Sequence, residues 1–310
     1  MLEVQSLSRY YGEFAAIQDI SFKIEQHQVV GFLGLNGAGK STTLKILATL
    51  LTPSTGTVII DGKDYDDADI SFRSNIGFLP EDPPLYREMN VSKFLEHVAR
   101  LRKMDRHQFK DRLPTVIKQC QLQGKEQAII NTLSLGYRKR VGIAQAIIHN
   151  PKLIILDEPI SGLDPLQIAD MRMVIRSLAE NATVLLSSHN LSEVEETCDR
   201  LLILHQGRLI AQGTTEQLAS NLTKDIFRIE LELVNKRTKI ESSLSTLSDI
   251  IRFEFIEERE DSCLLLLTLS KSPEHLVPLL VKQGLGIRML QNARSELEEI
   301  FLSLTKGGTQ

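Results

Sequence analysis

The chain has 310 residues, of which 42% are hydrophobic and 25% are charged, a balance typical of a soluble globular protein large enough for two domains. Its formal net charge of −4 counts against a nucleic-acid-binding module, which usually presents a concentrated positive face. No apolar run reaches the roughly 18 residues that a membrane span needs, and the N-terminus lacks the basic and apolar segments of a secretory signal, so we expect a cytoplasmic protein.

Residues 2–8 and 14–24 read as strands, which predicts an antiparallel β region at the start of the chain. The loop between them carries Tyr10 and Tyr11. An aromatic ring at this place could stack on an adenine, although a tyrosine at a strand end is more often simply packed against its neighbours. The residues alone leave both interpretations open.

The stretch 28–51 places a glycine-rich turn between an apolar run and a helical pattern. The run 29–33 is continuous, as in a strand buried on both faces of a parallel sheet. The pattern G-x-x-x-x-G-K-S follows it, and in such a P-loop the backbone N–H groups and a helix N-terminus converge on a polyphosphate. Lys40 would reach the β- and γ-phosphates, and the Ser41 hydroxyl would ligate Mg²⁺. The expected phosphate-site residues are Gly34, Asn36, Gly37, Ala38, Gly39, Lys40, Ser41 and Thr42.

After the P-loop, strands are predicted at 57–62 and 75–80, and the adjacent prolines in 81–89 exclude a helix there. Apolar residues then recur at helical spacing. Residues 90–130 therefore form a mostly helical insertion between parallel strands, within a helical subdomain that spans about 90–140.

Two later strands end in side chains that can do chemistry. Asp157 and Glu158 follow the apolar run 153–156, and His189 follows 183–188. Because an open α/β sheet binds ligands at the carboxyl ends of its strands, Asp157 is predicted to bind Mg²⁺ directly or through water, and Glu158 to act as the general base. Two adjacent acids could also be ordinary solvent-exposed side chains at the end of a strand. A lone histidine at a strand end usually has a structural role only. With a phosphate loop in the same chain, we favour a γ-phosphate contact for His189.

The character of the chain changes at about residue 223. The order of patterns from 223 to 310 is β-α-β-β-α-β-α, which predicts a small α+β domain of the ferredoxin-like type followed by one helix. Its charges look like solvated faces, and it holds no catalytic constellation. We expect a regulatory or dimer-forming role.

Taken in order, these motifs resemble the ATPase cassettes of ABC transporters. The resemblance covers about residues 2–215 and implies an α/β P-loop cassette over 1–222, with a mostly parallel core, an antiparallel β region and a helical subdomain. It also implies an ATPase that uses ATP and Mg²⁺. The motifs are Walker A at 34–42, LSLGY at 133–137, Walker B at 153–158, SGLD at 161–164 and SSH at 187–189.

The same resemblance assigns further residues. Tyr11 is implied as the adenine-stacking aromatic in preference to Tyr10. Ser134 and Gly136 are implied to contact the γ-phosphate of ATP bound to the opposite subunit, so that two copies sandwich two nucleotides head to tail. Asp164 of SGLD belongs to the same nucleotide-binding set.

Two positions depart from the usual family pattern. Glu81 stands where the family usually has glutamine, and LSLGY replaces LSGGQ. An ionised glutamate could hold Mg²⁺ or its water through an oxygen but cannot donate a hydrogen bond. Both substitutions, with EDPPLY and LEEIFLSLT, look like the branch that contains gliding-motility, drug-resistance and sodium exporters, which favours export.

The resulting hypothesis is the cytosolic ATPase subunit of an exporter, peripheral on the inner face of the cell membrane. It would act as a homodimer on a separate multispanning permease, which would select the cargo; ATP would close the dimer and hydrolysis would reopen it. The alternative is a soluble ABC-type factor acting on ribosomes or DNA, but such factors usually have two fused cassettes, a long coiled coil or a basic linker. An importer subunit would commonly end in a barrel that the order β-α-β-β-α-β-α does not match.

Overall fold

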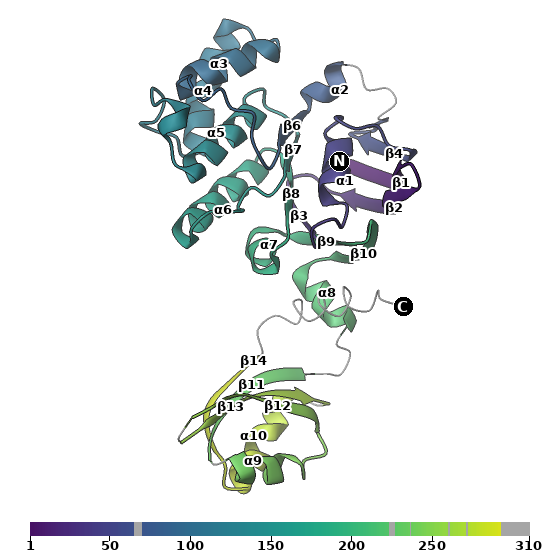
Figure 1. Cartoon of the computed structure of the whole chain (residues 1–310), viewed down its shortest axis with the longest axis vertical. Helices are drawn as coiled ribbons and strands as arrows, with labels where there is room; N and C mark the ends of the chain where they lie inside the picture. The colour runs from purple at the N-terminus through teal and green to yellow at the C-terminus, as the bar shows by residue number, and fades with distance from the viewer. Residues whose placement is uncertain (65–69, 223–226, 236, 260, 271, 293–310) are drawn as a thin grey trace. The chain divides into compact units, whose positions relative to one another are not determined.

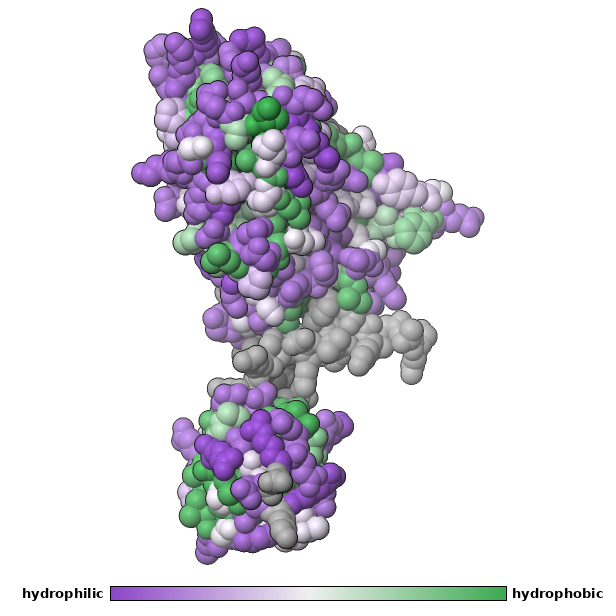
Figure 2. All heavy atoms as spheres, turned by 60° about the vertical axis from the view of Figure 1, so that its left-hand side comes forward, coloured by the Kyte–Doolittle hydropathy of each residue, from purple (hydrophilic) through white to green (hydrophobic). Residues whose placement is uncertain are grey.

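The computed structural model describes residues 1–64, 70–222, 227–235, 237–259, 261–270 and 272–292 (Figure 1). The chain divides into two compact units, one covering Met1–Thr215 and the other beginning at Glu216. Hydrophilic side chains dominate the face of the first unit drawn in Figure 2, with apolar residues scattered between them. Among the described helices, none combines the length and the apolar character that crossing a bilayer would require.

The centre of the first unit is a six-stranded sheet in the order β10-β9-β3-β8-β7-β6. Its strands run parallel except for β10, which pairs antiparallel with β9. The strands β3, β7 and β8 are buried along their whole length, as their continuous apolar runs predict. The strands are β3 (Val29–Leu33), β6 (Ile76–Leu79), β7 (Leu153–Leu156), β8 (Thr183–Ser188), β9 (Arg200–His205) and β10 (Arg208–Gly213).

A four-stranded antiparallel sheet in the order β2-β1-β4-β5 packs on this centre. One apolar core joins the two sheets and α1, and within it Phe22 meets Phe32 edge to face with ring centroids 5.4 Å apart. The antiparallel region predicted from the first strands is therefore present. Its strands are β1 (Leu2–Tyr11), β2 (Phe14–Ile24), β4 (Thr55–Ile60) and β5 (Lys63–Asp64).

Helices α3, α4 and α5 lie on the opposite side of the central sheet from β1, β2 and β4 (Figure 1). Side chains at their N-termini explain where they begin: Asn90 accepts a hydrogen bond from Lys93 N, and Asp105 forms a capping box with Gln108. The helices of this unit are α1 (Lys40–Leu47), α2 (Ile70–Ser74), α3 (Val91–Leu101), α4 (Arg106–Gln119), α5 (Leu135–Ile147), α6 (Pro165–Ala179) and α7 (Leu191–Thr197), with a 3₁₀ turn η2 (Ile130–Thr132).

The second unit has its own sheet and its own core. The sheet is antiparallel in the order β12-β13-β11-β14, and Leu231, Leu265 and Leu267 are fully buried in its core cluster together with Ile240 and Leu280 of the helices. The element order β-α-β-β-α-β agrees with the sequence pattern, while the last predicted helix lies outside the described residues. The elements are α8 (Thr215–Leu222), β11 (Phe227–Val234), α9 (Arg237–Leu244), β12 (Ile250–Glu258), β13 (Cys263–Leu269), η3 (Pro273–His275), α10 (Leu276–Lys282) and β14 (Gly286–Asn292).

A histidine just after α5 has a lowered pKa, from which we expect the fold to lose stability in acid. The Nε2 atom of His149 lies 3.0 Å from Ile76 O. Burial, and then the charges of Arg102 and Arg112, lower the pKa of His149 from 6.5 to about 4. As the pH falls below 6.5, the unfolded chain therefore binds a proton before the folded chain does, and stability is lost until the pH reaches about 4.

We expect His149→Gln, which keeps a donor for Ile76 O, to lose less stability than the wild type between pH 6.5 and about pH 4. The difference should be on the order of 3 kcal/mol at most. Urea unfolding of both proteins across this range measures it, since acid effects of other groups are common to both. Equal losses in the two proteins would show that His149 does not drive the acid sensitivity.

Candidate nucleotide site

The loop between β3 and α1 is shaped by close packing. Gly39 takes φ of 102°, and a Cβ atom there would lie 2.7 Å from Ile17 Cγ2 and 2.8 Å from Ala16 O. A Cβ at Gly34 would lie 2.6 Å from Leu204 O. No side chain caps the start of α1, so its first N–H groups remain directed at the loop, where they suit an anion.

Lys40 is held across this loop. Its Nζ atom donates to Gly34 O at 2.7 Å and Leu35 O at 3.3 Å, and lies 3.8 Å from Glu158 Oε1. Burial lowers the pKa of Lys40, while nearby carboxylates, first Glu158, oppose this effect. The ammonium is thus fixed within the concavity that the glycines form.

Asp157 and Glu158 are buried directly after β7, being 4% and 7% exposed. Ser187 of the neighbouring strand β8 donates from Oγ to Asp157 Oδ1 at 2.6 Å and accepts from Glu158 N at 2.9 Å. Ser41 Oγ lies 3.3 Å from the same Asp157 oxygen. A hydroxyl and a carboxylate oxygen so close together fit Mg²⁺, which prefers oxygen ligands and is commonly bound by one or two protein groups plus substrate phosphates.

Glu158 is held in a strained conformation with φ of 49°. The left-handed region is unfavourable for a glutamate, and a following proline such as Pro159 disfavours helical backbone as well. Such strain costs on the order of 1–3 kcal/mol and persists where the surroundings impose it. The carboxylate itself is oriented by His189, whose Nδ1 lies 3.0 Å from Glu158 Oε2.

Lys40, Ser41, Glu158 and His189 line one pocket of about 520 Å³, and Asp157 adjoins it through its contact with Ser41. The structure brings most of the predicted residues together there, including Glu81, which lies with Glu158 and His189 on the lining. The pocket is lined by Tyr11, Phe14, Ala16, Asn36, Gly37, Gly39, Lys40, Ser41, Thr42, Glu81, Glu158, Ser161 and His189.

Six predicted residues are absent from the pocket lining, namely Gly34 and Ala38 of the phosphate loop, Asp157, and the trio Ser134, Gly136 and Asp164. Ser134 caps α5 by accepting from Tyr137 N, and Asp164 caps α6 by accepting from Gln167 N. Gly136 lies in the first turn of α5, where a Cβ would come within 2.7 Å of Gln167 Oε1. Tyr10 is also absent from the lining, whereas Tyr11 is part of it.

Sequence reasoning missed the pocket residues Phe14, Ala16 and Ser161, and it missed Ser187 beside the acids. Phe14 lines the pocket, is 67% exposed and stands directly opposite Tyr11 in the pairing of β1 with β2. Only the register of that hairpin reveals it. Ser187, which holds both acids, lies in the SSH motif but bears no mark in sequence that separates it from Ser188.

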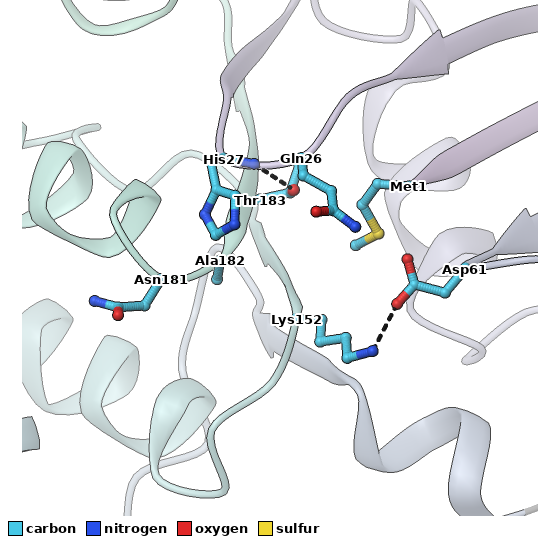
Figure 3. A pocket seen from close by; sticks show the side chains of 8 residues that line it. All are labelled: Met1, Gln26, His27, Asp61, Lys152, Asn181, Ala182 and Thr183. Atoms are coloured by element: carbon cyan, nitrogen blue, oxygen red, sulfur yellow. Dashed lines mark hydrogen bonds and ion pairs between the residues drawn. The ribbon is translucent and has the colours of Figure 1, made fainter.

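A second pocket, of about 280 Å³, opens at the other end of the parallel strands (Figure 3). His27 and Lys152 on its wall precede β3 and β7, and Thr183 begins β8. Its polar groups contact one another: His27 N donates to Thr183 Oγ1, and Lys152 pairs with Asp61 at 2.8 Å. This pocket shares no lining residue with the nucleotide pocket and lies away from the phosphate loop.

Comparison with known proteins agrees with this geometry. A family model described as ABC transporter matches residues 17–161. An uncharacterised ABC transporter ATP-binding protein of Methanocaldococcus jannaschii is 32% identical over 84% of this chain and 97% of its own length. The chain belongs to the ABC transporter ATP-binding proteins. The bacitracin transport ATP-binding protein BcrA of Bacillus licheniformis is 30% identical over 100% of this chain and 98% of its own.

Solved structures of ABC ATPases share the fold. An ATP-binding subunit of an ABC transporter has a TM-score of 0.64 at 33% identity, over 72% of this chain and 93% of that one. The dimeric structure of the bacterial cassette MJ0796 has a TM-score of 0.62 at 25% identity, over 69% of this chain and 98% of that one. The resemblance read from the motifs is confirmed, as is the P-loop cassette fold with mixed α/β sheets.

We expect Phe14→Ala to weaken ADP binding roughly fivefold, because stacking of an aromatic ring on a base contributes about 1 kcal/mol or more. Binding of inorganic tripolyphosphate, which has no base, should not change. Tyr10→Ala is the matched control, since Tyr10 lies on the same hairpin outside the pocket. Isothermal titration measures all three; unchanged ADP affinity in Phe14→Ala would remove this residue from the base site.

Proposed function

We propose that this protein is the Mg²⁺-dependent ATPase subunit of an ABC exporter and works as a homodimer on a separate multispanning permease. The observation that carries the proposal is the convergence of Lys40, Glu158 and His189 on one pocket beside a glycine loop and a helix N-terminus, with Asp157 in contact with the pocket residue Ser41. Fixed donors and charges around a polyphosphate are what phosphoryl transfer needs from a protein.

Each residue has a distinct task in this proposal. The loop N–H groups and Lys40 bind the phosphates, and Ser41 and Asp157 hold Mg²⁺, directly or through water, with Glu81 near it. When bound, the ion supplies charge neutralisation at the transferred phosphoryl group. Glu158 accepts the proton of the attacking water, and His189 orients Glu158 and contacts the γ-phosphate. Tyr11 and Phe14 receive the adenine.

The homodimer accounts for Ser134, Gly136 and Asp164, which lie outside the pocket. Ser134 and Asp164 are exposed at the N-termini of α5 and α6, and we propose that Ser134 and Gly136 reach the ATP bound to a second copy. Asp164 would lie at the same interface. The dimeric structure of the cassette MJ0796 supports the formation of a dimer. ATP binding closes the dimer in this scheme, and hydrolysis reopens it.

A role in transport is supported by the relative BcrA, a bacitracin transport ATP-binding protein that matches 100% of this chain; the direction, export, is our proposal from the motif pattern. We assign 1–222 as the cassette, with a helical subdomain at about 90–140, and 223–310 as an accessory domain. The order β12-β13-β11-β14 with two helices supports a ferredoxin-like class for the accessory domain, with a regulatory or dimer-forming role.

We propose that the permease docks on a groove of about 450 Å³ in the first unit, with the protein peripheral on the inner face of the membrane. Its lining combines apolar side chains with the three cations Lys45, Arg73 and Arg102. Leu50 on the wall is 64% exposed. The alternative, a soluble factor on ribosomes or DNA, gains no support from the named relatives, which are transporter ATP-binding proteins.

We expect Glu158→Gln to bind ATP but to hydrolyse it about 10²- to 10⁴-fold more slowly, because the proton acceptor is lost. Repulsion between the carboxylate and the γ-phosphate is also removed, so an ATP-bound dimer should accumulate. Phosphate release and size-exclusion chromatography with and without ATP measure both effects. Hydrolysis at the wild-type rate would exclude Glu158 as the base.

Adding Ser134→Arg to Glu158→Gln should abolish the ATP-bound dimer. A dimer that persists in this double variant would contradict the head-to-tail arrangement in which two copies enclose two nucleotides.

Leu50→Asp should lower recovery of a multispanning membrane protein with the tagged subunit, since it places a carboxylate in an apolar wall. Met173→Asp is the control, because Met173 is 56% exposed on α6 and does not line the groove. Detergent extraction, affinity capture and mass spectrometry give the ratio of partner to subunit. Equal recovery with both variants would rule out this groove as the docking site.

A further inference from the structure

Helix α5 carries a buried cation for which the proposed mechanism has no use. Lys139 is 5% exposed, and its Nζ atom donates to two main-chain carbonyls, Glu158 O and Ser161 O, each at 2.7 Å. Both carbonyls belong to the loop that follows β7. Lys139 therefore ties α5 to the segment that presents the catalytic carboxylate.

Helix α5, which carries Lys139, is itself held in place by its neighbours. Lys139 lies little more than one turn from Ser134, the N-cap of α5. Arg140 anchors the same helix to α6 through Asp170 at 2.9 Å, and Gly136 packs closely against Gln167. A displacement of the α5 N-terminus is therefore transmitted to the Lys139 ammonium by a packed helix.

The backbone at Glu158, which Lys139 contacts, has a conformation that its hydrogen-bond partners maintain. Glu158 has φ of 49°, and its main-chain N–H is held by Ser187 Oγ while its main-chain oxygen is held by Lys139. Ser161 N also donates to Glu158 O at 3.4 Å. Removing the ammonium leaves the carboxylate chemistry intact but withdraws one of the groups that fix its backbone.

We propose that Lys139 is a positioning residue that couples the two nucleotide sites of the dimer. Engagement of Ser134 and Gly136 by the ATP of one site sets the position of α5, and Lys139 passes that position to Glu158 of its own chain. This inference rests on the proposed function, since it takes Glu158 as the base and α5 as the surface facing the partner's ATP.

A broken coupling has a signature that simple loss of structure does not have. Lys139 does not line the nucleotide pocket, so ATP affinity and ATP-driven dimerisation should survive its replacement. Only the step after closure should fail. A variant that binds ATP, forms the closed dimer and then holds it unhydrolysed is expected.

Lys139→Met keeps the length of the side chain and removes its donors. We expect kcat for ATP hydrolysis to fall on the order of 10- to 100-fold, as for small misplacements of catalytic groups, with ATP affinity unchanged and an ATP-bound dimer accumulating. Lys152→Met is the matched control, since Lys152 is an exposed lysine in a surface ion pair, and should match the wild type. Lys139→Ala, which leaves room for water at the two carbonyls, gives the same test if the methionine variant does not fold.

Wild-type kcat in either Lys139 variant would overturn the proposal. So would a loss of ATP affinity or of dimer formation in step with the rate, since Lys139 would then act on the fold or on the nucleotide site. Glu158→Gln, measured alongside, separates the two levels: if it hydrolyses ATP normally, the proposed function fails, whereas an inactive Glu158→Gln beside a normal Lys139→Met refutes only the coupling.

Discussion

The site depends on the parallel pairing of β3, β8 and β7. In this register Leu33 pairs with Ser188 and Leu156 with Leu186, so all three strands end at the same edge of the sheet. The glycine loop leaves β3 at that edge, both acids leave β7, and His189 leaves β8. Residues more than a hundred positions apart in sequence thereby reach hydrogen-bond distance, as with Ser41 and Asp157.

Burying several charges beside this edge is costly, and the structure compensates with specific partners. Lys40, Lys139, Asp157 and Glu158 are each less than 10% exposed, yet each has named hydrogen-bond or ionic partners in its own unit. The strained backbone of Glu158 persists for the same reason, because surrounding contacts impose its conformation. Charge burial and backbone strain lower the stability of the fold here, and both come from holding these side chains in fixed positions.

The second unit is organised differently. Among the described residues of this unit, Glu232 is the buried carboxylate, 8% exposed. It accepts hydrogen bonds from Ser262 at 2.7 Å and from Arg288 at 3.2 Å. Those partners belong to the same sheet region, so the charge is satisfied internally. A sheet with a complete core of its own can keep its fold without contacts to the cassette, which suits an accessory domain.

The sequence by itself determined the elements whose signals are local. Continuous apolar runs marked β3, β7 and β8, and the glycine pattern marked the phosphate loop, because burial on both faces and tight turns leave a trace in adjacent residues. The order of strands and helices after residue 223 was also readable for the described elements. Tertiary structure alone decided which side chains meet. Phe14 entered the pocket through the register of β1 with β2, Ser187 reached both acids through the pairing of β7 with β8, and Lys139 reached Glu158 through the packing of α5. Register and packing are set by the sum of many contacts across the fold, and no window of neighbouring residues contains that sum.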